Sequence, residues 1–133
     1  MRIEEIATIV VDSAMKVHTV LGPGLLESAY RECLAHELAM RGVDVSQEQA
    51  LPIRYEGREI SVGYRIDLLL DQQVIVELKT AERLLPIHMA QILSYLRLSG
   101  CRLGFLINFH VPHLRDGIRR VVNGLKSARS LNR

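Results

Sequence analysis

Four charged residues stand within two otherwise apolar segments in the middle of the chain. Arg65 and Asp67 interrupt the first segment, "YRIDLLL". Glu77 and Lys79 interrupt the second, "QVIVELKT". Both segments are typical of β-strands, in which alternate side chains point to opposite faces, so each charged pair shares one face of its strand. Two carboxylates and an ammonium group gathered on a sheet could hold a divalent cation and activate a water molecule.

The loop between the two strands decides whether their carboxylates meet. A three-residue loop at residues 71–73 places Asp67 directly opposite Glu77, with Cβ atoms about 4.5–5.5 Å apart, whereas a two-residue loop places them on opposite faces. Opposed carboxylates repel each other unless they are neutralised, and Mg²⁺ does this better than Lys79 alone. The strands leave a second interpretation open, in which Arg65 pairs with Glu77 and Asp67 pairs with Lys79 in two cross-strand salt bridges.

A third carboxylate lies on the segment "GLLESAY", residues 24–30. Glu27 and Tyr30 have the i, i+3 spacing of one helical face, and Leu34 continues that face. The spacing indicates that this face points inward. A carboxylate on a buried stripe needs a partner, and we therefore expect Glu27 to join the charged residues of the two strands.

A polar stripe marks the segment "IHMAQILSYLRLSG", residues 87–100. His88, Gln91 and Tyr95 have the i, i+3, i+7 spacing of one helical face, while the apolar residues occupy the other side. Their side chains offer hydrogen-bond donors suited to phosphate oxygens. Simple exposure of the stripe to solvent explains the same pattern, and the sequence leaves both interpretations open.

The spacing of apolar residues and breakers predicts the order ααβββαβα. Three strands in a meander and a fourth strand that follows a helical crossover give a mixed four-stranded sheet flanked by helices. We expect breaks at Pro52 and Gly63 and a turn at Glu56-Gly57. The predicted helices cover about residues 3–20, 25–41, 86–99 and 113–125, and the predicted strands lie within 43–57, 58–70, 73–80 and 102–109.

Composition limits the class of protein. The chain has 133 residues, of which 48% are hydrophobic and 24% charged, as expected for one globular domain with no room for a separate DNA-recognition domain. Acidic and basic residues in the first helix exclude a signal peptide or membrane span there. Two cysteines without a disulfide pattern indicate reduced thiols, and we expect a cytoplasmic protein.

Basic residues gather towards the end of the chain. Residues 115–133 contain six basic residues and one acid, although the formal net charge of the whole chain is only +2. Such a segment either faces phosphate groups or forms a solvated helix followed by a basic tail, which we place at residues 126–133. The first interpretation makes Arg115, Arg119 and Arg120 candidates for nucleic-acid binding.

The ordered motifs resemble those of a known nuclease superfamily. "ID-x9-ELK", from Asp67 to Lys79, resembles the motif of the PD-(D/E)XK nuclease superfamily, and "GLLESAY" resembles the signature of the GxxExxY family within it. Ile66 stands where the motif name has Pro, at a position without a ligand role. The resemblance covers nearly the whole chain and implies one α/β domain with a restriction-endonuclease-like αβββαβ core.

The resemblance also implies roles for individual residues. Asp67, Glu77 and the main-chain carbonyl of Leu78 would bind Mg²⁺ or Mn²⁺, with Glu27 as a further acid. Lys79 would orient or deprotonate the attacking water. The segment that contains Gln91 and Tyr95 matches the QxxxY motif of relatives of recombination exonucleases, which makes both residues catalytic candidates.

The expected function is therefore metal-dependent hydrolysis of phosphodiester bonds in nucleic acid, and we expect the nucleic acid to be DNA. Arg65 and His88 are further candidates for nucleic-acid contacts. The alternative is a catalytically silent module of the same fold that binds nucleic acid or regulates a partner. We also expect a homodimer, because a small domain recognises nucleic acid weakly and the first helix carries a row of apolar residues that could form an interface. These residues are Ile6, Ile9, Val10 and Val17.

Overall fold

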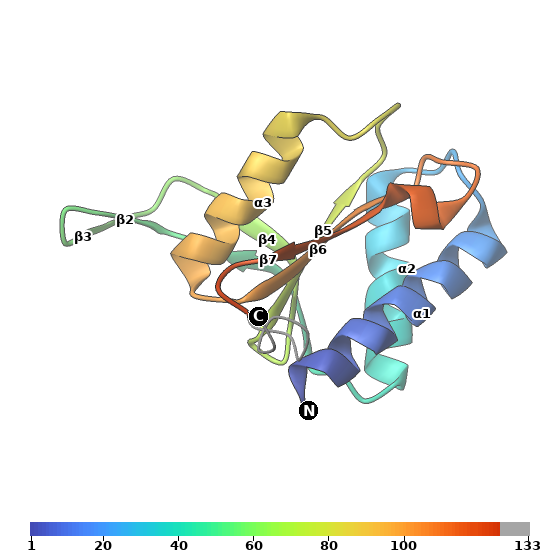
Figure 1. The fold of residues 1–133 in the computed structure, drawn as a ribbon, viewed down its shortest axis with the longest axis horizontal. Coiled ribbons are helices and arrows are strands. Elements are labelled where there is room, and N and C mark those ends of the chain that lie inside the picture. Colours follow the sequence, from blue (N-terminus) through green and yellow to red (C-terminus); the bar gives the residue numbers. More distant parts are fainter. Residues whose placement is uncertain (126–133) are drawn as a thin grey trace, which may run out of the picture.

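The computed structural model describes residues 1–125, so the predicted basic tail at residues 126–133 lies outside the described residues. Within the described part, a mixed β-sheet lies between helices on both of its faces (Figure 1). The helices are α1 (Ile3–Leu21), α2 (Glu27–Met40), α3 (Pro86–Ser99) and the short 3₁₀ helix η1 (Leu114–Gly117). The strands are β1 (Val45–Ala50), β2 (Ile53–Tyr55), β3 (Arg58–Ile60), β4 (Arg65–Leu70), β5 (Val74–Lys79), β6 (Leu103–Asn108) and β7 (Ile118–Val122).

The main sheet has five strands in the order β1-β4-β5-β6-β7. Strands β5 and β6 run parallel, and every other neighbouring pair is antiparallel. The crossover between β5 and β6 is α3, which covers one face, while α1 and α2 cover the other (Figure 1). The predicted α/β class and mixed sheet are confirmed, but the predicted number of four strands is wrong.

The last strand corrects a prediction made for residues 113–125. The sequence predicted a helix there, but the chain forms η1 and then β7, which pairs with the edge of β6. Gly117 explains the sharp entry into β7, because a Cβ at this position would collide with the carbonyl oxygen of Asn108. The β-branched residues that follow favour a strand.

The long extended segments divide at their predicted breaks. Strand β1 ends before Pro52, and Gly63, with φ +85°, separates β3 from β4. Between these two points, β2 and β3 form a separate hairpin that projects from the main sheet (Figure 1). Glu56 and Gly57 both have positive φ, as a two-residue hairpin turn requires, which confirms the predicted turn.

Helix α1 turns its apolar stripe into the core. Ile6, Val10 and Val17 are buried against α2 and the sheet, and Ile9 packs at the border of this core. The homodimer prediction took these residues as an interface, and their burial removes that basis. Among residues 1–125, no helix is both long and apolar enough to cross a membrane.

Candidate functional site

The hairpin of β4 and β5 brings the two strand carboxylates together. Leu68 pairs with Val76 and Leu70 with Val74, which leaves the three-residue loop 71–73 between the strands. Continuing this register places Asp67 opposite Glu77. The predicted loop length and register are therefore confirmed, and both carboxylates lie on the face that α3 covers.

At these two residues the backbone hydrogen bonds between β4 and β5 stop, and hydrogen bonds to the two carboxylates replace them. In β1, Glu48 has φ +49° and drops out of the pairing with β4 opposite Asp67. The Asp67 N–H donates instead to Oε2 of Glu77 at 3.0 Å. In return, the Leu78 N–H donates to Oδ2 of Asp67 at 2.8 Å. Each carboxylate is thus held in place by a backbone amide.

Burial makes this carboxylate pair electrostatically unusual. The side chain of Glu77 is only 5% exposed. Burial, a hydrogen bond to the Asp67 carboxyl group and the negative charge of that group raise the pKa of Glu77 from 4.5 to about 9. Burial and the neighbouring charge therefore favour the protonated form of Glu77 when no cation is bound.

The salt-bridge interpretation of the strands is wrong. Within residues 1–125, no ion pair joins Asp67 or Glu77 to a basic side chain. Arg65 is exposed and donates to the carbonyl oxygen of Glu48 at 3.4 Å. Lys79 is partly buried on the same face as the carboxylates, and its charge acts to lower the pKa of Glu77 without reversing the shift.

Glu27, the first residue of α2, approaches the two strands from the other layer, close enough to feel the charges of Asp67 and Lys79. Partial burial and the negative charge of Asp67 raise its pKa, whereas Lys79 and Arg31 oppose the rise. The neighbouring Tyr30 fixes this helix start, because its hydroxyl accepts a hydrogen bond from the Leu25 N–H and donates one to a glycine carbonyl in the preceding turn. In "GLLESAY", the tyrosine anchors the loop that presents the glutamate.

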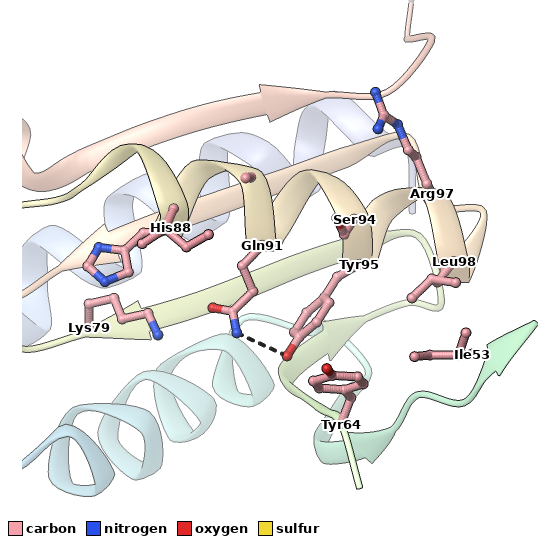
Figure 2. Close-up of a pocket in the computed structure, with 11 residues that line it drawn as sticks. Ile53, Tyr64, Lys79, His88, Gln91, Ser94, Tyr95, Arg97 and Leu98 are labelled. Atoms are coloured by element: carbon pink, nitrogen blue, oxygen red, sulfur yellow. Dashed lines mark hydrogen bonds between the residues drawn. The ribbon is translucent and has the colours of Figure 1, made fainter. Parts of the chain in front are cut away.

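The polar face of α3 lines a cavity that includes Lys79 but not Glu27, Asp67 or Glu77. His88, Gln91 and Tyr95 line a cavity of about 740 Å³ together with Lys79 (Figure 2). Nε2 of Gln91 donates to the Tyr95 hydroxyl at 3.4 Å. Burial, and then the charge of Glu77, raise the pKa of Tyr95. Tyr95 is 7% exposed, so simple exposure to solvent does not explain this stripe.

Residues 4–121 match the family model described as the PD-(D/E)XK nuclease superfamily. The chain belongs to this superfamily. A solved structure titled "Crystal structure of SSO0001" is similar at a TM-score of 0.46 and 16% sequence identity, over 96% of this chain and 70% of that one. No curated protein matches the chain.

The donor set of this PD-(D/E)XK protein fits a hard divalent cation. Asp67 and Glu77 supply carboxylate oxygens, and Leu78 adds a main-chain carbonyl. The N–H of Leu78 points to Asp67 on β4, and the carbonyl of Leu78 therefore faces β4 as well. Within residues 1–125, no three His, Cys, Asp or Glu side chains are close enough to hold a metal by themselves. Carboxylate and carbonyl oxygens are nevertheless the kinds of ligand that Mg²⁺ and Mn²⁺ take.

The basic residues near the end of the described chain lie apart from this cluster. Arg115 is on η1, and Arg119 and Arg120 are on β7, an edge strand that β6 separates from β5. Arg120 pairs with Glu4 of α1 at 2.9 Å, on the sheet face opposite α3. The structure therefore does not bring these three arginines together with the carboxylates, and their contact with nucleic acid stays a prediction.

Two features of the PD-(D/E)XK site escaped the sequence reasoning. Tyr64 and Ile53, beside the projecting hairpin, line the same cavity as Lys79. Asn108, which is 1% exposed at the end of β6, holds the segment after β5 through hydrogen bonds with both backbone groups of Ala81. A polar residue at the end of the apolar run "GFLIN" was the available signal for Asn108.

Proposed function

We propose that this PD-(D/E)XK protein is a metal-dependent nuclease that hydrolyses phosphodiester bonds in nucleic acid. The observation that carries the proposal is the contact of the buried Glu77 with the partly buried Asp67, on the strand face that also carries Lys79. Two ionised carboxylates this close repel each other, and a cation relieves that repulsion. Superfamily membership over residues 4–121 supports the same conclusion.

The carboxylates of Asp67 and Glu77 and the carbonyl of Leu78 hold Mg²⁺ or Mn²⁺, with Glu27 as a further acid. When bound, such a cation neutralises the phosphate and lowers the pKa of a water molecule. Lys79, which lines the cavity and lies two residues after Glu77 on β5, orients the attacking water and stabilises negative charge on the phosphate.

The face of α3 positions the substrate. Gln91 can donate to a phosphate oxygen, because its amide lines the cavity and makes only a long hydrogen bond to Tyr95. The Tyr95 hydroxyl keeps its proton at neutral pH, since its pKa is raised, and it acts as a second donor. His88 lines the same cavity, and its Nδ1 accepts a hydrogen bond from the Leu85 N–H, which fixes its ring at the start of α3.

The second candidate function is a silent module that binds nucleic acid or regulates a partner. One observation favours it: within residues 1–125, the acids do not form a set of three closely placed ligands. Such a module keeps the cavity and the binding residues but lacks turnover. Cleavage of nucleic acid by the purified protein separates the two candidates.

The finer parts of the proposal concern family, polymer, assembly and location. The hydrogen bonds of Tyr30 to the loop before Glu27 support membership of the GxxExxY family, because they give the tyrosine of that signature a structural role next to its glutamate. DNA as the polymer, the cytoplasm as the location and one nuclease-like domain over residues 1–133 remain part of the proposal. The homodimer also stays a prediction, which light scattering at high protein concentration tests.

The direct test is a cleavage assay. Wild-type protein is incubated with linear, circular and single-stranded DNA and with RNA, in Mg²⁺, Mn²⁺ or EDTA. We expect cleavage with a divalent cation, none in EDTA, and a loss of at least 100-fold in Lys79→Ala, as for an essential group in proton transfer or charge stabilisation. If folded wild-type protein cleaves none of these polymers with either cation, the nuclease proposal fails.

A further inference from the structure

We infer that the cavity beside Lys79 receives an unpaired nucleobase stacked on Tyr64, so that the protein acts on single-stranded nucleic acid. The inference rests on the proposed function for its substrate class. It adds a binding residue from outside the carboxylate cluster and a preference between single strand and duplex.

The distribution of aromatic residues is the first observation. The whole chain has six aromatic residues, four Tyr and two Phe, and no Trp. Tyr30, Phe105 and Phe109 are buried in the core between the sheet and the helices α1 and α2. Tyr64 and Tyr95 instead line one cavity, with ring centroids 6.1 Å apart and tilted by 57°. A chain poor in aromatic residues therefore places two of them in the cavity that Lys79 also lines.

The two tyrosines differ in exposure, which indicates how they act together. Tyr95 is 7% exposed and forms part of the packed floor under α3, whereas Tyr64 is 44% exposed. The tilted contact with Tyr95 supports one side of the Tyr64 ring, and the rest of the ring remains open to the cavity. A supported, accessible ring of this kind is a stacking platform for a base.

The polarity of the cavity changes along its length. Figure 2 shows Lys79, His88 and Gln91 at one end and the side chains of Ile53, Tyr64 and Leu98 at the other, where Arg97 points away from these three. A nucleotide has a similar arrangement, because its phosphate is charged and the flat faces of its base stack on aromatic surfaces. With a phosphate held near Lys79, the attached base can lie against Tyr64. The volume of about 740 Å³ is in the usual range for a small-molecule site.

A paired base cannot use this platform. In a duplex, both faces of each base are stacked on neighbours, and moving one base out of the stack costs free energy. In a single strand, the base faces are accessible and stack on aromatic side chains with little regard to sequence. The cavity therefore favours single-stranded DNA or RNA over a duplex of the same sequence.

Fluorescence anisotropy in EDTA tests the inference without any cleavage step. The probes are a labelled single-stranded DNA oligonucleotide of mixed sequence, the RNA of the same sequence and the corresponding DNA duplex. The proteins are the wild type, Tyr64→Ala, Tyr64→Phe and Tyr64→Trp. Tyr55→Ala is the matched control, because Tyr55 is 62% exposed on the projecting hairpin and does not line the cavity.

We expect the wild type to bind the single strands more tightly than the duplex. Tyr64→Ala weakens single-strand binding about tenfold, as the loss of one base–aromatic stack does. The same variant leaves duplex binding unchanged, and Tyr64→Phe and Tyr64→Trp keep the affinity for single strands. Tyr55→Ala behaves as the wild type. This pattern supports the inference whether the single strand is DNA, RNA or both.

Three results overturn the inference: a wild type that prefers the duplex, a Tyr64→Ala variant that binds the single strands normally, and an equal loss for single strand and duplex. A change confined to the association state of Tyr64→Ala also overturns it, because the cavity then serves a protein contact. Failure of the proposed function appears differently, as absence of cleavage with Mg²⁺ or Mn²⁺. Binding that depends on Tyr64 without cleavage supports the inference and rejects the nuclease.

Discussion

Glu77→Gln should make the metal-free protein more stable at neutral pH. The folded state holds a proton on Glu77, with a pKa of about 9, whereas the unfolded chain releases it near the ordinary value of 4.5. The folded state therefore binds more protons than the unfolded state between these two values. The stability that Glu77 contributes is fully present below pH 4.5 and is lost as the pH rises towards 9.

The size of the effect follows from these two pKa values. One pKa unit corresponds to about 1.4 kcal/mol, so raising the pH from 4.5 to 7 removes about 3 kcal/mol of folding stability through this residue. Glutamine does not titrate. Its amide oxygen can still accept from the Asp67 N–H, and its NH₂ group can donate to the Asp67 carboxylate. Glu77→Gln should therefore gain up to about 3 kcal/mol at pH 7, or roughly 10 °C in melting temperature.

Thermal melts in EDTA from pH 5 to pH 8 measure this gain. The advantage of Glu77→Gln over the wild type should grow with pH across this range. Glu82→Gln is the matched control, because Glu82 is exposed in the loop after β5 and should melt as the wild type does. Two results refute the account of a buried Glu77 that favours its protonated form. One is a Glu77→Gln variant that melts below the wild type at pH 7, and the other is a difference between the two proteins that does not change with pH.

Three further predictions concern the residues that support the site. Asn108→Ala should lower the free energy of unfolding, measured by urea denaturation, by about 2–3 kcal/mol, because it leaves the partly buried N–H and carbonyl of Ala81 without their partner. A loss below about 0.5 kcal/mol contradicts this role. Tyr30→Phe should lower the free energy of unfolding by about 1–2 kcal/mol, because two hydrogen bonds of the hydroxyl are lost, and it should lower the cleavage rate by displacing Glu27. An unchanged urea midpoint and an unchanged rate contradict the anchoring role of Tyr30. Arg120→Ala should change stability by less than about 0.5 kcal/mol, because its ion pair is exposed, and a larger loss in the same assay shows a structural role.

The sequence predicted the centre of the site because short-range rules determine it. A strand alternates its side chains, so the loop length alone places Asp67 and Glu77 on one face or on two. The i, i+3 spacing of Glu27 and Tyr30 also depends only on near neighbours in the sequence, and it placed both residues on one helical face. The parallel neighbour of β5 followed from the fully apolar run of β6 and the helix before it.

The parts that the sequence did not predict depend on tertiary contacts. The β-branched residues of "GIRRVV" favour a strand only weakly. Its pairing with β6 decides, together with the tight approach of Gly117 to Asn108. The breaks at Pro52 and Gly63 were predicted, but not that the strands between them leave the main sheet. Tyr64 was missed for the same reason, because only the projecting hairpin and α3 together form its cavity.

Calorimetric titration of Mg²⁺ and Mn²⁺ into the purified protein tests the central claim most directly. The account predicts saturable binding of both ions to the wild type. It predicts binding at least tenfold weaker to Glu77→Gln, because that variant removes one of two carboxylate ligands while it preserves the fold. Glu82→Gln should bind as the wild type does. A wild type that binds neither ion, or a folded Glu77→Gln variant that binds both as tightly as the wild type, contradicts a metal site at Asp67 and Glu77.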